Sequence, residues 1–301
     1  MNGVLVGTFE PLSAAWHSAR AGGLGGSEIA AVLGLSPWES RFSLWHRKAG
    51  RLGPPAENEE MEWGKRLESA VVGKFADNHP ELNIGRAGTY RHPDRAWQVA
   101  NPDRLCYTPR ADRSGHDVAA ILEAKAALFD DEWGPVGGDQ VPPYVRCQAL
   151  WYCDTLGVDA AHVAVLIGGH DYREYTLHPD PADVAVMLTA GQEFIASVAE
   201  GRRPPIDSAD ATYQAIRTFH PDIDPVDVEI GAGLANDYLR AQEQAKAAEA
   251  EKRLRSSQVL DAIGTGRRAV CDREPIAVRV PGRGDSPPFL RPCRAKKASL
   301  T

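Results

Sequence analysis

The 301-residue chain is long enough to bury a full-sized hydrophobic core, as one large domain or two smaller ones. Its net charge of −7 argues against a protein that coats nucleic acid through bulk positive charge, although a carboxylate-lined metal site can coexist with that total. The start of the chain lacks the pattern of a signal peptide, and no window approaches the roughly 18 apolar residues that span a bilayer. We therefore expect a soluble, cytoplasmic protein.

The first third of the chain predicts three helices. A glycine-rich loop leads to Ser27, which can cap a short helix that stops between Gly34 and Pro37. A second helix is expected from Ser40 to Ala49. The segment EEMEWGKRLESAVVGKFADN places its apolar residues at helical spacing, which predicts a third, amphipathic helix over residues 59–78.

The middle of the chain changes to the period of strands. Short alternating or β-branched runs between residues 85 and 126 predict a meander of strands. The pair Pro142-Pro143 suits the first turn of a helix that ends at Gly157. Two further strands, AHVAVLIGG and YREYTLH, and the helix ADVAVMLTAGQEFIASVAEG follow in order.

A linker near residues 201–207 divides the chain into a main domain over residues 1–206 and an extension over residues 207–301. The extension predicts a short helix at 209–219 and a long, alanine-rich helix at 233–263, which is exposed or seeks a partner. A small hairpin and a basic, disordered end complete it.

The cysteines are odd in number and scattered, and no two of them have the two-residue gap of zinc or redox sites. Free thiols in a reducing compartment are the expectation for these five residues: Cys106, Cys147, Cys153, Cys271 and Cys293.

The residues that indicate chemistry are Asp103, at the entrance of one strand, and Glu123 and Lys125 on another. Alternate side chains of a strand share a face, so Glu123 and Lys125 point the same way, and a hairpin would bring Asp103 beside them. Two converging carboxylates suit Mg²⁺ or Mn²⁺, and a lysine at the same place can act on the attacking water. Phosphodiester hydrolysis needs these parts.

A solvated strand edge is the alternative interpretation, because Glu and Lys are common surface residues. The position of Glu123 directly after the apolar run AAIL argues against it, since a solvated charge is unusual there.

Neighbouring blocks fit a known arrangement between about Arg20 and Gly157. They are R-x6-S continuing into SEIAAVLGLSPWESRFSLW, then WGKRLES, NPDR, LEAK and VPPYVRCQALWYCDTLG, in that order. With them the chain resembles the YqaJ-type viral recombinase family, which includes the lambda exonuclease, within the PD-(D/E)XK nuclease superfamily. The resemblance implies an α/β (α+β) fold with a central mixed sheet flanked by helices, followed here by a C-terminal helical extension.

The resemblance also implies roles for individual residues. Glu68 resembles the helix-borne acid that supports the metal shell. Lys125 would act on the nucleophilic water, and Gln148 would orient that water or the lysine. The implied ligands of one or two Mg²⁺ ions, for which Mn²⁺ can substitute, are the side chains of Asp103, Glu123 and Glu68 and the backbone carbonyl of Ala124.

Arg20 and Ser27 match the positions that hold the 5′-phosphate of a DNA end in lambda-type enzymes. A serine hydroxyl and an arginine fork can both bind a phosphate. A helix cap at Ser27 and a surface charge at Arg20 are the simpler interpretations of the same two residues.

The chain departs from the family pattern in two places. The stretch from 107 to 117 is long for such a hairpin and holds Asp112 and Asp117, which could compete as ligands. The family's second helix glutamine is Leu150 here. Tryptophans 16, 38, 45, 63 and 151 mostly fall on predicted helix faces and are expected in the core rather than as base-stacking platforms.

By resemblance the function is digestion of linear double-stranded DNA from its ends, 5′ to 3′, for recombination. A ring-shaped homo-oligomer, such as a trimer, and a single-strand annealing partner protein are implied as well. An endonuclease of the same fold and a non-catalytic DNA-end-binding protein are the alternatives. GGLGGS lacks the Lys-Ser/Thr ending of a phosphate loop, so we expect no nucleotide cofactor.

Overall fold

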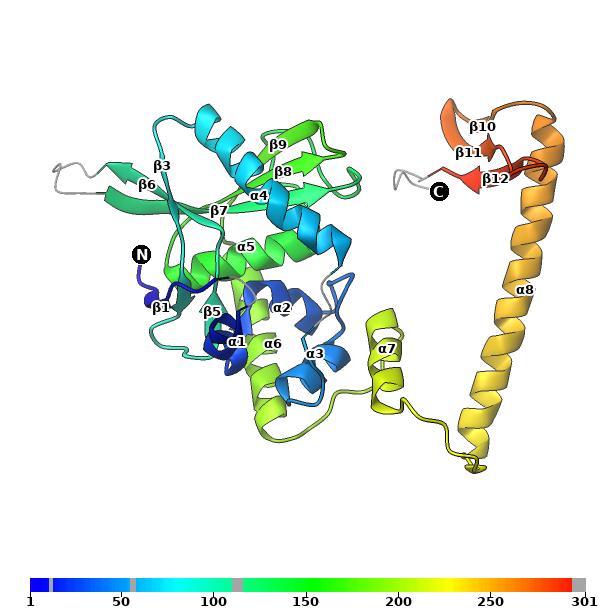
Figure 1. Cartoon of the computed structure of the whole chain (residues 1–301), viewed down its shortest axis with the longest axis horizontal. Coiled ribbons are helices and arrows are strands. Elements are labelled where there is room, and N and C mark those ends of the chain that lie inside the picture. The colour runs from blue at the N-terminus through cyan, green and yellow to red at the C-terminus, as the bar shows by residue number, and fades with distance from the viewer. Residues whose placement is uncertain (11–12, 55–57, 110–115, 294–301) are drawn as a thin grey trace. The chain divides into compact units, whose positions relative to one another are not determined.

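The computed structural model describes residues 1–10, 13–54, 58–109 and 116–293. It divides the chain into two compact units, residues 1–222 and 223–301 (Figure 1). The division predicted after residue 206 is therefore corrected. Helix α7 (Asp210–Phe219) belongs to the first unit because the hydroxyl of its buried Thr212 is hydrogen-bonded to the Ser40 hydroxyl, at 2.7 Å, beside helix α3 (Arg41–Lys48).

A five-stranded mixed sheet forms the centre of the first unit. Its strand order is β3-β6-β7-β8-β9, and only β7 and β8 among these neighbours run parallel. Helix α5 (Pro143–Leu156) makes the crossover that a parallel pair requires. The strands are β3 (Asn83–Arg86), β6 (Arg104–Pro109), β7 (His116–Ala127), β8 (Ala161–Ile167) and β9 (Asp171–Leu177).

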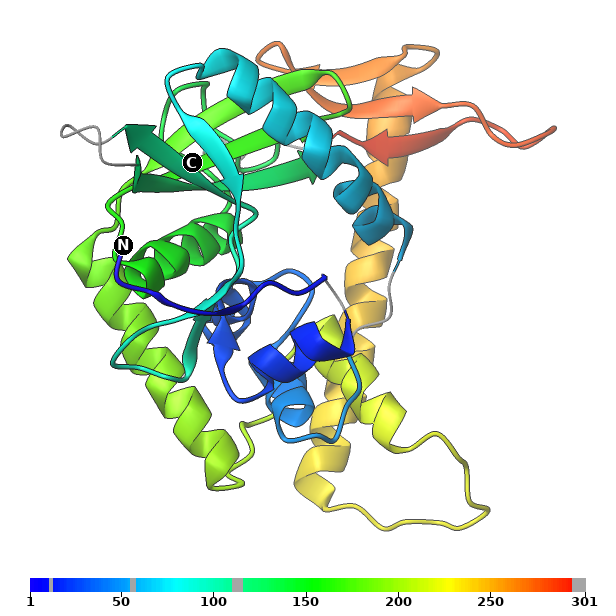
Figure 2. The ribbon, with the colours of Figure 1, turned by 60° about the vertical axis from the view of Figure 1, so that its left-hand side comes forward.

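Helices α4 (Glu59–Asn78) and α5 lie on opposite faces of this sheet (Figure 2). Alternation along β7 serves both faces: Leu122 packs in the cluster with Val71 and Phe75 of α4, and Ile121 packs in the cluster that includes α5. Side chains in phase with Ile121 therefore point toward α5. Glu123 and Lys125 are in that phase.

The predicted meander over 85–126 is only partly correct, because two of its strands join another sheet. That sheet has the order β1-β4-β5-β2. Its antiparallel neighbours are β1 with β4 and β4 with β5, whereas β2 pairs with β5 in parallel. Its strands are β1 (Val4–Gly7), β2 (Leu24–Gly25), β4 (Thr89–Arg91) and β5 (Gln98–Ala100).

Helix α2 (Gly26–Val32) follows β2 directly and packs on α5. Its N-cap is Gly25, so the predicted cap at Ser27 is wrong and Ser27 lies in the first turn. A Cβ atom at Gly26 would come within 2.5 Å of the Tyr152 ring, so this close approach requires glycine. The short helix α1 (Ala14–Ala21) precedes β2.

Helix α6 (Pro181–Ala199) is the one helix in the described part of the chain that is long and apolar enough to cross a membrane by length and composition. The expectation that no window approaches that composition is corrected for this helix. Its Met187 and Phe194 are buried in the main core cluster, so one face of α6 packs against the first unit.

The second unit consists of helix α8 (Ala232–Ile263) and an antiparallel sheet in the order β10-β11-β12. The strands are β10 (Arg268–Cys271), β11 (Glu274–Val280) and β12 (Phe289–Pro292), so the predicted hairpin gains a third strand. None of the residues of α8 is buried. Most of the predicted basic end falls outside the described residues.

Candidate active site

The register of β6 and β7 brings Asp103 next to Glu123. Arg104 pairs with Leu122, and the residue before β6 therefore lies opposite the residue after Leu122. The Ala124 N–H has no strand partner on that side and donates to Asp103 Oδ2 at 2.8 Å. Because the N–H and C=O of one strand residue point to the same side, the Ala124 carbonyl also faces the Asp103 edge.

Glu123, Lys125 and Gln148 form a closed hydrogen-bonded triangle. Glu123 Oε1 accepts from Lys125 Nζ at 2.7 Å and from Gln148 Nε2 at 2.6 Å. Lys125 Nζ also donates to Gln148 Oε1 at 3.0 Å. Glu123 is only 2% exposed, so these contacts fix a charged group inside the protein. The three side chains selected from the sequence are thus brought together.

Burial and mutual repulsion change the charges of this cluster. Burial, and next the Glu123 carboxylate, raise the pKa of Asp103 well above its usual value. Burial also raises the pKa of Glu123, although Lys125 opposes the change. Burial alone would lower the pKa of Lys125, but Glu123 and Asp103 outweigh it and raise that pKa. The Lys125 ammonium therefore stays charged. Its single positive charge does not balance the Asp103 and Glu123 carboxylates, whose pKa values both remain raised.

A hard cation would supply that charge, and the cluster fits one. Glu123 Oε2 is buried and finds no hydrogen-bond partner among the described residues. Together with the carboxylate of Asp103 and the carbonyl of Ala124, it offers the oxygen ligands that Mg²⁺ prefers. Within the described ranges, however, no three His, Cys, Asp or Glu side chains are gathered closely enough to form a preformed metal cage.

The third candidate carboxylate, Glu68, is held by Arg104 rather than by the Asp103 and Glu123 cluster. It approaches from α4 and accepts a hydrogen bond from Arg104 Nη1 at 2.8 Å, and the same guanidinium donates to the Asp103 carbonyl at 2.6 Å. Glu68 also contributes to the raised pKa of Asp103. Sequence reasoning did not select Arg104 as a site residue, although its place in NPDR was a usable signal.

Arg20 and Ser27 form a second, smaller group. Arg20 Nη2 lies 3.4 Å from Ser27 Oγ, and the guanidinium stacks over the Trp16 ring at 4.2 Å from its centroid. Their connection to the triangle runs through Tyr152, which touches Gly26 and whose hydroxyl lies 3.2 Å from Gln148 Nε2. The pair thus neighbours the acids without touching them.

A buried ion cluster beside this pair was missed in the sequence. Glu28 forms ion pairs with Lys48 at 2.9 Å and Arg47 at 3.3 Å, and it accepts the Gly25 N–H at 2.8 Å. Burial raises the pKa of Glu28, but Lys48, Arg20 and Arg47 together lower it to about 2. The sequence signal was an acid inside an apolar run, the same signal that singled out Glu123.

Asp112 lies outside the described residues. Asp117 pairs with Thr108 at the opposite end of β7 from Glu123, so it does not compete as a ligand there. Leu150 is a core residue. None of the five cysteines forms a disulfide; Cys106, Cys147 and Cys153 are buried, and burial raises the pKa of each thiol.

The tryptophan expectation is partly wrong. Trp45 and Trp151 are in the core, but Trp38 and Trp63 are 66% and 61% exposed. Trp16 is partly buried.

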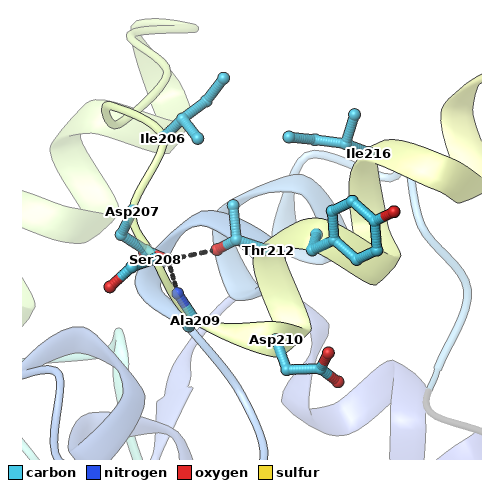
Figure 3. A pocket seen from close by; sticks show the side chains of 8 residues that line it. Ile206, Asp207, Ser208, Ala209, Asp210, Thr212 and Ile216 are labelled. Carbon is cyan, nitrogen blue, oxygen red and sulfur yellow. Dashed lines mark hydrogen bonds between the residues drawn. The ribbon is translucent and has the colours of Figure 1, made fainter. Parts of the chain in front are cut away.

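A separate hollow of about 410 Å³ lies along the start of α7 and shares no residue with the carboxylate cluster. In Figure 3 the Asp207 carboxylate turns back onto the start of the helix: Asp207 Oδ1 accepts from the Ala209 N–H at 2.9 Å and from Thr212 Oγ1 at 2.6 Å. These bonds are the local hydrogen bonds of a helix N-terminus, here that of α7.

Comparison with known proteins gives this geometry a context. Residues 15–158 match the model of the YqaJ-like viral recombinase domain. The uncharacterized protein YqaJ of Bacillus subtilis (strain 168) is 27% identical over 208 residues, which are 67% of this chain and 61% of that relative.

The solved structure of an alkaline exonuclease, LHK-Exo of Laribacter hongkongensis, is similar with a TM-score of 0.50. It is 18% identical over 63% of this chain and 94% of that chain. LHK-Exo in complex with dAMP is similar with the same TM-score and coverage, and 19% identity. Residues 15–158 therefore match a YqaJ-like viral recombinase domain, and the mixed sheet with its flanking helices has the PD-(D/E)XK fold of these structural neighbours.

Proposed function

We propose that the chain is a Mg²⁺-dependent exonuclease that digests linear double-stranded DNA from its ends, 5′ to 3′. The observation that carries the proposal is the buried cluster of Asp103, Glu123, Lys125 and Gln148, with one carboxylate oxygen left unpaired. The family, and a fold shared with an alkaline exonuclease, support it.

In this proposal the side chain of Asp103, Glu123 Oε2 and the Ala124 carbonyl hold one or two Mg²⁺ ions, or Mn²⁺ in their place. When bound, such an ion polarises the phosphoryl oxygen and makes a water more acidic. Glu68, held by Arg104, supports this shell from outside.

Lys125 and Gln148 do the positioning. Because the pKa of Lys125 is raised, its ammonium stays charged and can hold the attacking water or balance charge on the phosphate. Gln148 touches both Lys125 and Glu123, so it keeps the ammonium and the carboxylate at a fixed spacing.

Arg20 and Ser27 would hold the 5′-phosphate of the DNA end in the same proposal. The guanidinium and the hydroxyl are adjacent, and both can donate to phosphate oxygens. A site for the end explains a preference for linear DNA, because a closed circle has no terminal phosphate.

The decisive test compares linear, 5′-phosphorylated duplex with closed-circular duplex, with and without Mg²⁺. We expect nucleotides to be released from linear DNA only, and only with the metal. Lys125→Ala should slow the release by about 10²- to 10⁴-fold, and Lys74→Ala, at an exposed lysine of α4, should have no effect.

The other outcomes identify the alternatives. Nicking of closed circles would make the protein an endonuclease. Binding of DNA ends that survives chelation, with the substrate intact in every arm, would make it an end-binding protein.

We further propose a closed homo-oligomer, such as a ring trimer, and a single-strand annealing protein as its partner. Both come from the family resemblance. Light scattering should give a mass that is a multiple of 32.6 kDa, and a monomer mass at working concentration would reject the ring.

A further inference from the structure

Trp38, in the loop between α2 and α3, exposes 66% of its surface. Indole rings are usually buried because they offer a large apolar surface, so a tryptophan this exposed needs a reason. Trp45, seven residues later in α3, is fully buried in the same part of the first unit.

Hydrogen bonds and an ion pair hold the loop before and after Trp38 in the chain. Ser36 Oγ accepts the N–H groups of Trp38, at 3.3 Å, and of Glu39, at 3.2 Å. Glu39 is in turn bound by the Arg47 guanidinium at 2.6 Å. The exposure of Trp38 is therefore a feature of an anchored loop.

Tyr144 braces the indole from the side of the active site. The two rings meet edge to face, with centroids 4.7 Å apart and planes at 80°. Tyr144, Gln148 and Tyr152 are four residues apart in α5, so they share one face of the helix.

That face is the one that meets the catalytic cluster. Gln148 bonds to Glu123 and Lys125, and the Lys125 ammonium acts electrostatically on Tyr144, although burial is the larger influence and raises the pKa of Tyr144. Tyr144 therefore links the exposed indole to the turn of α5 that carries Gln148.

We propose that Trp38, braced by Tyr144, stacks on an unpaired base next to the phosphate that is cut. The inference rests on the proposed function and deepens it by naming the contacted part of the substrate. A flat aromatic face suits a nucleobase of any sequence, and inside a duplex the stacked neighbours cover both faces of a base, so a base that has left the stack offers its face to the indole. The site would therefore hold a single strand at the cluster.

The test measures stacking directly, without hydrolysis. Full-length protein in EDTA is mixed with a short 5′-phosphorylated single-stranded oligonucleotide that carries 2-aminopurine at its first base. Stacking on the indole should quench the probe's fluorescence, and Trp38→Ala should abolish the quenching and weaken binding by roughly 5- to 100-fold. Trp38→Phe should retain part of both.

Trp63→Ala is the matched control, because Trp63 is another tryptophan of similar exposure (61%) on α4. It should leave the quenching and the affinity unchanged. Quenching that persists in Trp38→Ala, or that is lost equally in Trp63→Ala, overturns the inference.

The two proposals fail separately. Hydrolysis of linear duplex with no effect of Trp38→Ala on quenching rejects the base contact and leaves the nuclease. Trp38-dependent quenching by a protein that never hydrolyses DNA keeps the base contact and rejects the nuclease.

Discussion

Ion pairs of similar length stand in opposite surroundings in the two units. Lys48 and Glu28 of the first unit are 2.9 Å apart, with 7% and 6% of their side chains exposed. Arg255 and Glu251 of the second unit are 2.7 Å apart, with 65% and 55% exposed. Distance alone would rank these pairs alike. Removal from water separates them, because a buried charge that loses its partner cannot be rescued by solvent.

The same contrast separates the whole units. The first unit places acids and lysines inside a packed sheet and helix layer, where their pKa values shift. Three side-chain ion pairs of the second unit lie on the surface of α8, where strong helix formers and short-range pairs stabilise a helix without a core. Mutations of charged residues in the first unit should therefore change stability and activity strongly, and mutations on α8 should change them very little.

The largest effect is expected at Glu28. Its pKa of about 2 in the folded protein is below the usual 4.5, so its contribution is complete above pH 4.5 and is lost as the pH falls toward 2. Glu28→Gln should lower the free energy of unfolding by about 3 kcal/mol at pH 7. Urea unfolding at several pH values measures it, and a difference from wild type that does not shrink with acid would contradict the assignment.

A smaller loss is expected at Gln148. Gln148→Leu removes the amide that hydrogen-bonds to both Lys125 and Glu123 and puts an apolar side chain of similar size in its place. Nuclease activity on linear duplex should fall about 10- to 100-fold, as for other residues that orient a metal site. An unchanged rate in a folded variant would show that the triangle needs only two of its members.

Asp103→Asn should stabilise the metal-free protein. The folded-state pKa of Asp103 is raised, so its favourable contribution exists below the unfolded value and is lost as the pH rises through the folded one. Wherever the carboxylate is charged, its burial beside Glu123 is a cost, and its removal should be worth on the order of 1 kcal/mol, or about 2–4 °C in Tm.

The control for that melt is the metal. Mg²⁺ should raise the Tm of the wild type more than that of Asp103→Asn. A Tm that falls in the variant without metal would show that the carboxylate is already compensated.

The smallest effect is expected on the surface of α8. Glu251→Gln removes an exposed pair with Arg255 and should change helix stability by only about 0.3–0.5 kcal/mol, an effect that salt removes. Circular dichroism during thermal unfolding measures it. A loss as large as that of Glu28→Gln would break the comparison between the units.

Sequence reasoning located elements whose signals are local. Helix α4 has the predicted bounds, and α5 begins at its proline pair and ends before Gly157, whose φ of +66° favours glycine. The shared phase of Glu123 and Lys125 followed from strand alternation alone.

Contacts between distant segments were less accessible. The strands β4 and β5 read like their neighbours, but they pair with β1 and β2, far back in the chain. Thr212 looked like part of a detached extension, yet its partner is Ser40. The exposure of Trp38 depends on what packs around its loop, which no periodicity encodes.

Gly26 allows the backbone beside Ser27 to lie directly against the Tyr152 ring. The hydroxyl of that ring lies 3.2 Å from Gln148 Nε2, so this contact sets the interval between Ser27 and the triangle. On the proposed function, that interval sets the distance between the bound 5′-phosphate and the phosphodiester bond that is cut. A bulkier residue there would change the size of the product before it changed the chemistry.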